Sequence, residues 1–296
     1  RQGQVGEAIG VYRAVLTDCL RVLGPDHPDT LTTRSNLAGA LQDAGQVEEA
    51  IEAYQTVLTD HLRVLGPDHF ITLTTRRNLA GALQDTGQVG EAIGVYRAVL
   101  TDHLRVLGPD HPDTLTTRHN RAVALQGAGR VEEAIKDFQA VLTDRLRVLG
   151  PDHPNTLLTR DNLVEVLSAA GRFDEAASVY QSIVEAWLLS ADSDDPDVLD
   201  ARDDLAWALG RAECFDEALA DYLKLIADYE RVMGVDDPDT LTARNNYICT
   251  LKNSGKIVEA VALYRELLSD VERALGADDE FAQEIVQRLC EWESEV

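Results

Sequence analysis

A 42-residue unit repeats along the whole of this chain. Its clearest mark is the tetrapeptide Gly-Pro-Asp-His, whose copies begin at Gly24, Gly66, Gly108 and Gly150. Related acidic segments continue the same spacing at residues 192–196, 234–238 and 276–279. A period of this length is typical of a solenoid, in which each unit buries its apolar face against its neighbours.

Each unit is predicted to hold two helices. All nine prolines lie in the segments that carry this mark, as expected if the stretches between them are helical. Residues 28–44 place apolar side chains on one side at helical spacing, Gly45 then breaks the chain, and residues 47–65 form a second apolar stripe. We name the first helix of each pair helix A and the second helix B.

Counting these elements predicts fourteen helices in a single array over residues 1–296. We expect a lone helix B at about 4–23, and a last helix at about 280–293. The six complete pairs between them start near residues 28, 70, 112, 154, 196 and 238. Since the chain opens inside a unit and without an initiator Met, we expect it to be part of a longer protein.

Two positions of helix B hold the same kind of residue in every copy. One is alanine, at Ala8, Ala50, Ala92, Ala134, Ala176, Ala218 and Ala260. The other is aromatic, at Tyr12, Tyr54, Tyr96, Phe138, Tyr180, Tyr222 and Tyr264. The alanines indicate close helix crossings with no room for a larger side chain. Such regularity favours core packing for the aromatic stripe over a cofactor site.

The combined pattern resembles the tetratricopeptide repeat family, in the 42-residue variety of kinesin light chains and bacterial regulators. It is carried by the Leu-Ala pairs of helix A, the turn glycine Gly45, the two fixed positions of helix B and the Gly-Pro-Asp-His connection. The resemblance implies an all-α, right-handed superhelical solenoid of antiparallel helix pairs, with helix A lining a concave groove. Arg121, Glu213 and Phe70 depart from the pattern and put local packing in doubt.

Composition narrows the class of function. The net charge is −25, and no apolar run approaches the roughly 18 residues that span a membrane. Residues 1–150 carry 19 acidic and 15 basic side chains, and residues 151–296 carry 33 and 12. This balance argues against nucleic acid as a partner. It favours a basic partner for the second half, or simply a solvated acidic surface. The four isolated cysteines indicate reduced thiols in the cytoplasm.

No motif predicts an enzyme, a cofactor or a metal site. The chain has no phosphate-binding loop, His-Glu-x-x-His motif or nucleophile elbow. The four aligned histidines lie a full repeat apart, too far to share a metal. A better interpretation is helix capping, because each precedes the first position of helix A, where His27, for example, stands before Pro28 and Asp29.

Polar side chains recur along helix A. Asparagine forms a ladder at Asn36, Asn78, Asn120, Asn162 and Asn246, with Asp204 in the remaining copy. Amides on the groove wall would hold an extended peptide backbone, or each would bond a neighbouring helix instead. Arginine recurs at Arg34, Arg76, Arg118, Arg160, Arg202 and Arg244, inside the apolar stripe. A buried guanidinium needs a carboxylate, so we predict structural pairs with the aspartates of helix B, which are Asp18, Asp60, Asp102, Asp144, Asp228 and Asp270, a series lost at Ala186.

The groove positions that vary between copies should select the ligand. They run from basic, with Arg77 and His119, to acidic, where Trp207 is the one large apolar side chain. The acidic set is Asp161, Glu165, Asp200, Asp203 and Asp204. We expect a cationic segment to dock there, beside Trp207, with Arg77 and His119 disfavouring its basic end. Alternatively, Trp207 turns sideways into a neighbouring helix.

These patterns predict a non-enzymatic scaffold that binds a protein or peptide, as a sensor or docking segment of a larger cytoplasmic regulator. The alternative is self-association through apolar faces of the incomplete terminal units. No nucleic acid, membrane, cofactor or metal is expected. A catalytic role would need a ligand or metal at a cluster of carboxylates.

Overall fold

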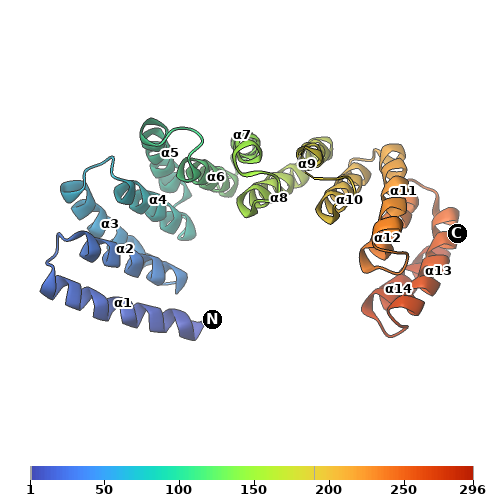
Figure 1. Ribbon diagram of the computed structural model, residues 1–296, viewed down its shortest axis with the longest axis horizontal. Coiled ribbons are helices and arrows are strands. Elements are labelled where there is room, and N and C mark those ends of the chain that lie inside the picture. The colour runs from blue at the N-terminus through green and yellow to red at the C-terminus, as the bar shows by residue number, and fades with distance from the viewer. Residues whose placement is uncertain (1, 190, 296) are drawn as a thin grey trace. The chain divides into compact units, whose positions relative to one another are not determined.

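A computed structural model describes residues 2–189 and 191–295, which form two compact units. The first unit is Arg1–Val148 and the second is Leu149–Val296. The regular structure of the described residues consists of fourteen α-helices, and each helix packs on the next within its unit (Figure 1). Whether the two units form the single array that the sequence predicts stays a prediction.

The helices start where the repeat predicts. In the first unit they are α1 (Gln2–Val22), α2 (Pro28–Asp43), α3 (Val47–Val64), α4 (Phe70–Asp85), α5 (Val89–Val106), α6 (Pro112–Gly127) and α7 (Val131–Leu149). In the second they are α8 (Pro154–Ala169), α9 (Phe173–Leu188), α10 (Pro196–Arg211), α11 (Phe215–Val232), α12 (Pro238–Asn253), α13 (Ile257–Ala274) and α14 (Glu280–Glu293). Even-numbered helices are helix A and odd-numbered ones helix B. The predicted helix count and the six predicted starts are confirmed.

A side chain caps the N-terminus of every helix A. His27 Nδ1 accepts a hydrogen bond from the backbone N–H of Asp29 at 3.2 Å, and Asp237 Oδ1 accepts one from Asp239 at 3.0 Å. Histidine does the same before α4, α6 and α8, and aspartate before α10 and α14. These caps satisfy backbone donors that a helix start leaves free. The capping interpretation of the aligned histidines is confirmed.

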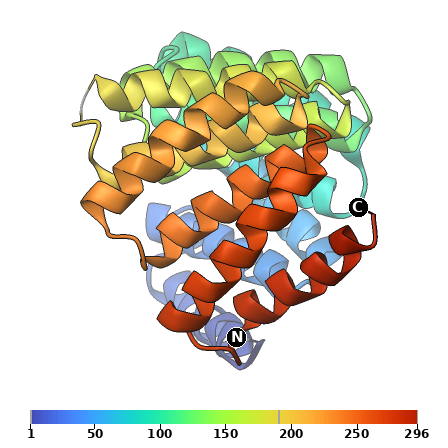
Figure 2. The same cartoon turned by 90° about the vertical axis from the view of Figure 1, so that its right-hand side faces the viewer.

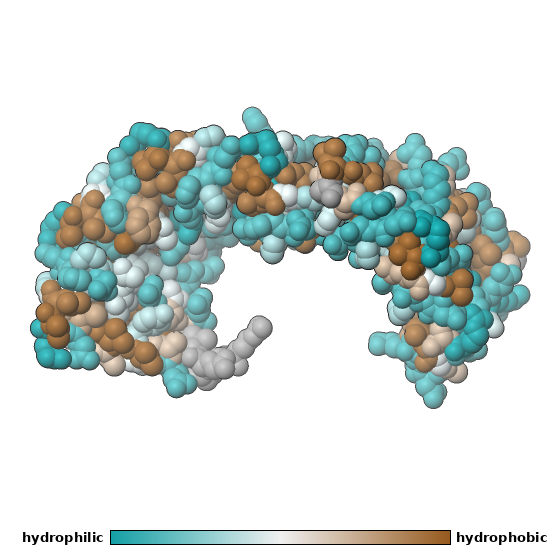
Figure 3. Space-filling model, in the orientation of Figure 1, coloured by the Kyte–Doolittle hydropathy of each residue, from teal (hydrophilic) through white to brown (hydrophobic). Residues whose placement is uncertain are grey.

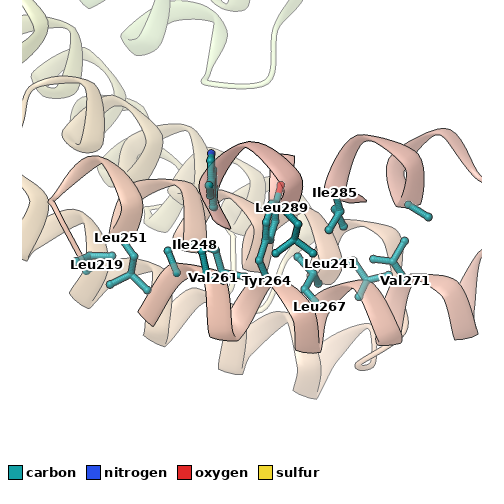
Figure 4. Packing of buried hydrophobic residues seen from close by; sticks show 13 residues of the cluster. Leu219, Leu241, Ile248, Leu251, Val261, Tyr264, Leu267, Val271, Ile285 and Leu289 are labelled. Atoms are coloured by element: carbon teal, nitrogen blue, oxygen red, sulfur yellow. The ribbon is translucent and has the colours of Figure 1, made fainter. Parts of the chain in front are cut away.

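The fixed positions of helix B form the core of both units. The alanines from Ala50 to Ala260 are 0 to 3% exposed, and the aromatic residues from Tyr54 to Tyr264 are 0 to 8% exposed. In the second unit, α11 to α14 follow one another side by side (Figure 2). Figure 4 shows how Tyr264 lies among Ile248, Leu267 and Leu289. Its ring stacks on Trp292 with 4.8 Å between centroids. Core packing, as predicted, accounts for the aromatic stripe.

A charged ladder joins helix A to helix B in five copies. The arginine of helix A contacts the aspartate of helix B in the pairs Arg34–Asp60 (2.6 Å), Arg76–Asp102 (2.7 Å), Arg118–Asp144 (2.5 Å), Arg202–Asp228 (2.8 Å) and Arg244–Asp270 (2.8 Å). Five of the six predicted aspartates are therefore confirmed as partners, whereas the prediction for Asp18 is wrong, because Asp18 contacts Arg21 on its own helix at 3.1 Å. The arginine side chains are 18 to 25% exposed, so they lie at the edge of the core and not inside it.

A second arginine extends each of these pairs. Arg63 donates to Asp60 at 3.0 Å and reaches back to Asp26, in the loop before helix A, at 2.9 Å. The same bridge recurs as Asp68–Arg105–Asp102, Asp110–Arg147–Asp144, Asp194–Arg231–Asp228 and Asp236–Arg273–Asp270. Each bridge holds two aspartates around one guanidinium and pins the loop to helix B.

One side of α1 is apolar and uncovered. Figure 3 shows hydrophobic side chains gathered along this helix, and Val11, Val15 and Val22 are among those that are exposed. Val15 is 43% exposed, whereas Val57 at the same position of the next copy is fully buried. No described helix covers this side of α1. Among the described residues, no helix combines the length and apolar character needed to cross a bilayer.

We predict that Ala134→Leu lowers the melting temperature sharply. Ala134 is fully buried at a helix crossing, and overpacking of this kind costs about 1–3 kcal/mol. Ala140→Leu, on the exposed side of the same helix, is the matched control and should change little. Thermal unfolding followed by circular dichroism measures both. Equal melting temperatures for the two variants would contradict the packing of this crossing.

We predict that Glu213→Gly stabilises the second unit. Glu213 has φ 61°, whereas the equivalent turn residue Gly171 has φ 71° and carries no Cβ. A left-handed conformation costs a residue with a side chain about 1 kcal/mol. Glu213→Gly should therefore raise the melting temperature by a few degrees, and Gly171→Glu should lower it. A lower melting temperature for Glu213→Gly would show that the glutamate side chain makes a compensating contact.

Candidate functional site

Two residues expected on the basic part of the groove wall lie inside the first unit instead. His119 is 5% exposed and its ring meets Phe138 edge-on at 5.5 Å. Burial lowers the pKa of His119 to about 4, so the imidazole is neutral at pH 7. Arg77 is half-buried and its guanidinium is 2.6 Å from Asp113. The expectation that His119 presents positive charge to a ligand is wrong, and the charge of Arg77 is balanced internally.

The asparagine ladder makes contacts within each unit. Asn78 and Asn120 lie close to the hydroxyl groups of Tyr54 and Tyr96, on the preceding helix B, and lower the pKa of these phenols against the larger effect of burial. Asn246 donates to Asp203 Oδ2 at 3.2 Å. These contacts match the alternative in which each amide bonds a neighbouring helix. Asn36 is exposed and Asn162 half-buried, and their role in holding a peptide stays a prediction.

Acidic side chains of the second unit surround a hollow of about 560 Å³. We call it the acidic hollow. It is lined by Asp152, Leu157, Arg160, Trp187, Asp197, Asp200, Ala201, Asp203, Asp204, Tyr229, Asp239 and Thr242. These residues come from α8 to α12 and the loops before them. Six are aspartates, and Arg160 is the one basic residue among them.

Three of the five acidic residues named from the sequence line this hollow. They are Asp200, Asp203 and Asp204, all on α10. Asp161 and Glu165 are exposed on α8 and do not line it, although Asp161 contacts Arg160 at 2.8 Å. The sequence therefore predicted the acidic residues of α10 correctly. The structure adds three further aspartates to the lining of the hollow, from neighbouring loops and helix starts: Asp152, Asp197 and Asp239.

Among the carboxylates of the hollow, Asp203 is the one whose charged form is least stabilised by its surroundings. Its Oδ2 accepts the hydrogen bond from Asn246, while its Oδ1 is buried with no hydrogen-bond partner. Burial raises the pKa of Asp203 to about 6, and the nearby carboxylates of Asp204 and Asp200 add to the effect. At neutral pH this group is a half-buried anion that has no ion pair with a cation among the described residues.

Two neighbouring groups, Asp204 and Tyr229, also have raised pKa values. Burial also raises the pKa of Asp204, against the opposing effect of Arg160, which lies 3.6 Å away. The Tyr229 hydroxyl donates to Asp200 at 2.8 Å, and burial together with this contact raises the pKa of the phenol. The site therefore holds several carboxylates at close range around a single guanidinium.

Two aromatic residues of the hollow were missed from the sequence. Trp187 and Tyr229 lie near the C-terminal ends of helices B, whereas the ligand-contacting residues were predicted on helix A. They occupy the position that holds His61 and His103 in the first unit. There, His103 Nδ1 is 3.0 Å from Thr117 Oγ1, whereas the threonine position is Ala201 beside Trp187 and Ala243 beside Tyr229. This loss of a regular histidine–threonine pair is the signal that marks the hollow.

Trp207 lies outside the acidic hollow. Its side chain is 46% exposed, and the guanidinium of Arg211 on the same helix sits 5.8 Å from the ring centroid. Arg211 also covers Phe173 at 5.4 Å. Trp207 is therefore on the surface, but its contact with a ligand stays a prediction.

Comparisons with known proteins agree with this architecture. Residues 1–61, 31–102, 72–136 and 114–188 match one sequence profile of the tetratricopeptide repeat, and residues 198–239 match a second. No curated protein matches the chain.

Two examples of similar solved structures follow. A Podosopora anserina protein with nearly identical tetratricopeptide-like repeats, of the kinesin light chain type, shares 28% identity over 70% of this chain and 98% of its own, with a TM-score of 0.56. BtubC (BKLC) from P. vanneervenii shares 15% identity over 79% of this chain and 91% of its own, with a TM-score of 0.54. The second likeness concerns the fold alone.

We predict that Asp203→Asn stabilises the protein at pH 7.5. A folded-state pKa of about 6, above the unfolded value near 4, means that folding takes up a proton and that stability falls as pH rises from about 4 to 6. Removing the charge should recover about 2 kcal/mol above pH 6 and flatten this slope. Glu165→Gln, which removes an exposed charge, is the control. Melting temperatures measured from pH 4 to 8 test this, and a lower melting temperature for Asp203→Asn at pH 7.5 would contradict it.

Proposed function

Because the chain belongs to the tetratricopeptide repeat family, we propose that it is a non-enzymatic scaffold that docks a cationic segment of a protein partner in its acidic hollow. Proteins of this family generally act as scaffolds for protein–protein interaction. In this proposal the chain is the docking segment of a larger cytoplasmic regulator.

The observation that carries the proposal is the imbalance of charge in the hollow. Six aspartates face one arginine in a recess, and the pKa of Asp203 and of Asp204 is raised, chiefly by burial and in addition by the neighbouring carboxylates. Fields from carboxylates add in a recess that water screens less than an open surface. An incoming cation would therefore gain from several carboxylates at once.

The aromatic lining supports the same kind of ligand. Trp187 is half-buried and places part of its ring beside the carboxylates, whereas Tyr229 is only 2% exposed and its ring is covered. Aromatic faces attract ammonium and guanidinium groups, and more strongly where water is displaced. A lysine or arginine side chain thus fits both kinds of lining, whereas an acidic segment fits neither.

To test this, we would follow Trp187 fluorescence in a Trp207→Phe/Trp292→Phe variant of the full chain. We expect Lys/Arg-rich peptides to bind and Glu-rich peptides of equal length not to bind at pH 7.5. Affinity should fall as salt rises from about 0.05 to 0.5 M, since screening shortens the range of these fields. Asp200→Asn/Asp204→Asn should weaken binding about tenfold, the effect of losing about 1.4 kcal/mol of charge interaction.

A charge-matched variant separates this site from the general acidity of the protein. Glu266→Gln/Glu272→Gln removes two exposed carboxylates from α13, which does not line the hollow. It should bind like the parent. Equal losses in both double variants, or binding that ignores peptide charge, would reject docking in the acidic hollow.

A further inference from the structure

The acidic hollow lies at the one interior copy in which the charged ladder is broken. In five copies an arginine of helix B stands 37 residues after a loop aspartate and bridges it to a second aspartate on its own helix. In the copy that contains α8 and α9 the loop aspartate is Asp152, but Leu189 replaces the arginine and Ala186 replaces the second aspartate. Both partners of the bridge are thus missing together.

The break leaves two charged groups without their usual partners. Asp152 lines the acidic hollow, and none of its polar atoms takes part in an ion pair or hydrogen bond among the described residues. Arg160, which in other copies would pair with the residue at Ala186, turns to Asp161 at 2.8 Å and Asp204 at 3.6 Å. It also approaches the Tyr180 ring at 5.8 Å. The hollow therefore contains an aspartate that the repeat elsewhere uses to hold a guanidinium.

We propose that an arginine side chain of the partner takes the place of the missing arginine, with its guanidinium held by Asp152 at the rim of the acidic hollow. This inference rests on the proposed function and names the side chain that the hollow selects. The five intact bridges are the independent observation, because they show an aspartate at this position binding a guanidinium within the same repeat.

The intact bridges also indicate why arginine fits better than lysine. Arg231 uses both terminal nitrogens on Asp194, at 2.5 and 2.7 Å, and still donates to Asp228 at 3.0 Å. A planar fork makes these parallel bonds, whereas an ammonium group acts as a point charge. A partner arginine would meet the Asp152 carboxylate in the same way.

The place of the missing side chain is open to solvent. Leu189 is 90% exposed, and its backbone, at φ −79° and ψ −21°, is still helical. A longer side chain at this position is not crowded by its neighbours. Because the backbone is still helical, the side chain points away from it as it would from a residue of the helix. The chain can therefore be given back its own arginine without overpacking.

Restoring the bridge is the decisive experiment. Ala186→Asp/Leu189→Arg restores both partners of the bridge and leaves the net charge unchanged. The new arginine of the chain itself should then occupy the place beside Asp152. We expect the full chain with this change to melt at the same or a higher temperature than the parent and to bind an arginine peptide at least about tenfold more weakly. The probes are fluorescein-labelled Gly-Ser peptides that contain two arginines, two lysines or two neutral citrullines.

Asp152→Asn gives a second test, with a matched control in the same protein. It should weaken the arginine peptide about tenfold and largely remove its preference over the lysine peptide. Asp110→Asn removes the equivalent aspartate in the first unit, where Arg147 already occupies the place, and should leave affinity unchanged.

The outcomes separate the two proposals. If the arginine and lysine peptides bind equally, or if both Asp152→Asn and the restored bridge bind like the parent, the arginine site is wrong while docking in the acidic hollow stands. If no cationic peptide binds the parent protein, both proposals fail. A restored bridge that unfolds the protein would itself contradict the inference, because it would show that the place is not open.

Discussion

The fold depends on one helix crossing that recurs every 42 residues. An alanine without exposed surface, such as Ala134, lets two helices approach, and an aromatic residue one turn later fills the space beside them. Because each pair buries its stripe only against the next pair, stability is built from neighbouring interfaces, and the exposed positions of helix A are left free to vary. The repeat can change its surface chemistry in one copy without losing its core, as it does at α10.

The charged ladder is a second set of contacts between helix A and helix B, and it is weaker than the apolar packing. Its arginines are partly exposed, and pairs of this kind contribute only modestly to stability. Their effect on the surface is larger, since each bridge neutralises carboxylates that would otherwise repel one another. Where Leu189 and Ala186 interrupt the ladder, Asp152 and Arg160 lose their usual partners, and Asp203 in the same hollow is a half-buried carboxylate with a raised pKa. A ladder that contributes little to stability can therefore be lost in one copy, and on the proposed function this loss makes room for a cationic partner.

The sequence predicted the parts of the structure that depend on spacing. Helix starts followed from proline and capping residues, and the partner of Arg118 followed from the constant distance to Asp144. It failed where a neighbouring helix decides which way a side chain points. Angles around a single helix placed His119 on a groove wall, yet Phe138 of the next helix covers it. Trp187 was missed because it belongs to helix B, although a comparison of equivalent positions between copies would have singled it out.

On the proposed function, stability and binding are linked in the hollow. Crowded carboxylates without a cation raise the free energy of the folded state, and Asp203 relieves part of this cost by holding a proton below pH 6. A bound cation would do the same at neutral pH, and any ligand that binds only the folded state stabilises it in proportion to its saturation. The proton and the cationic side chain thus compete for the same excess charge. On this view the hollow is kept acidic at some expense of stability, which is understandable if a partner supplies the missing positive charge.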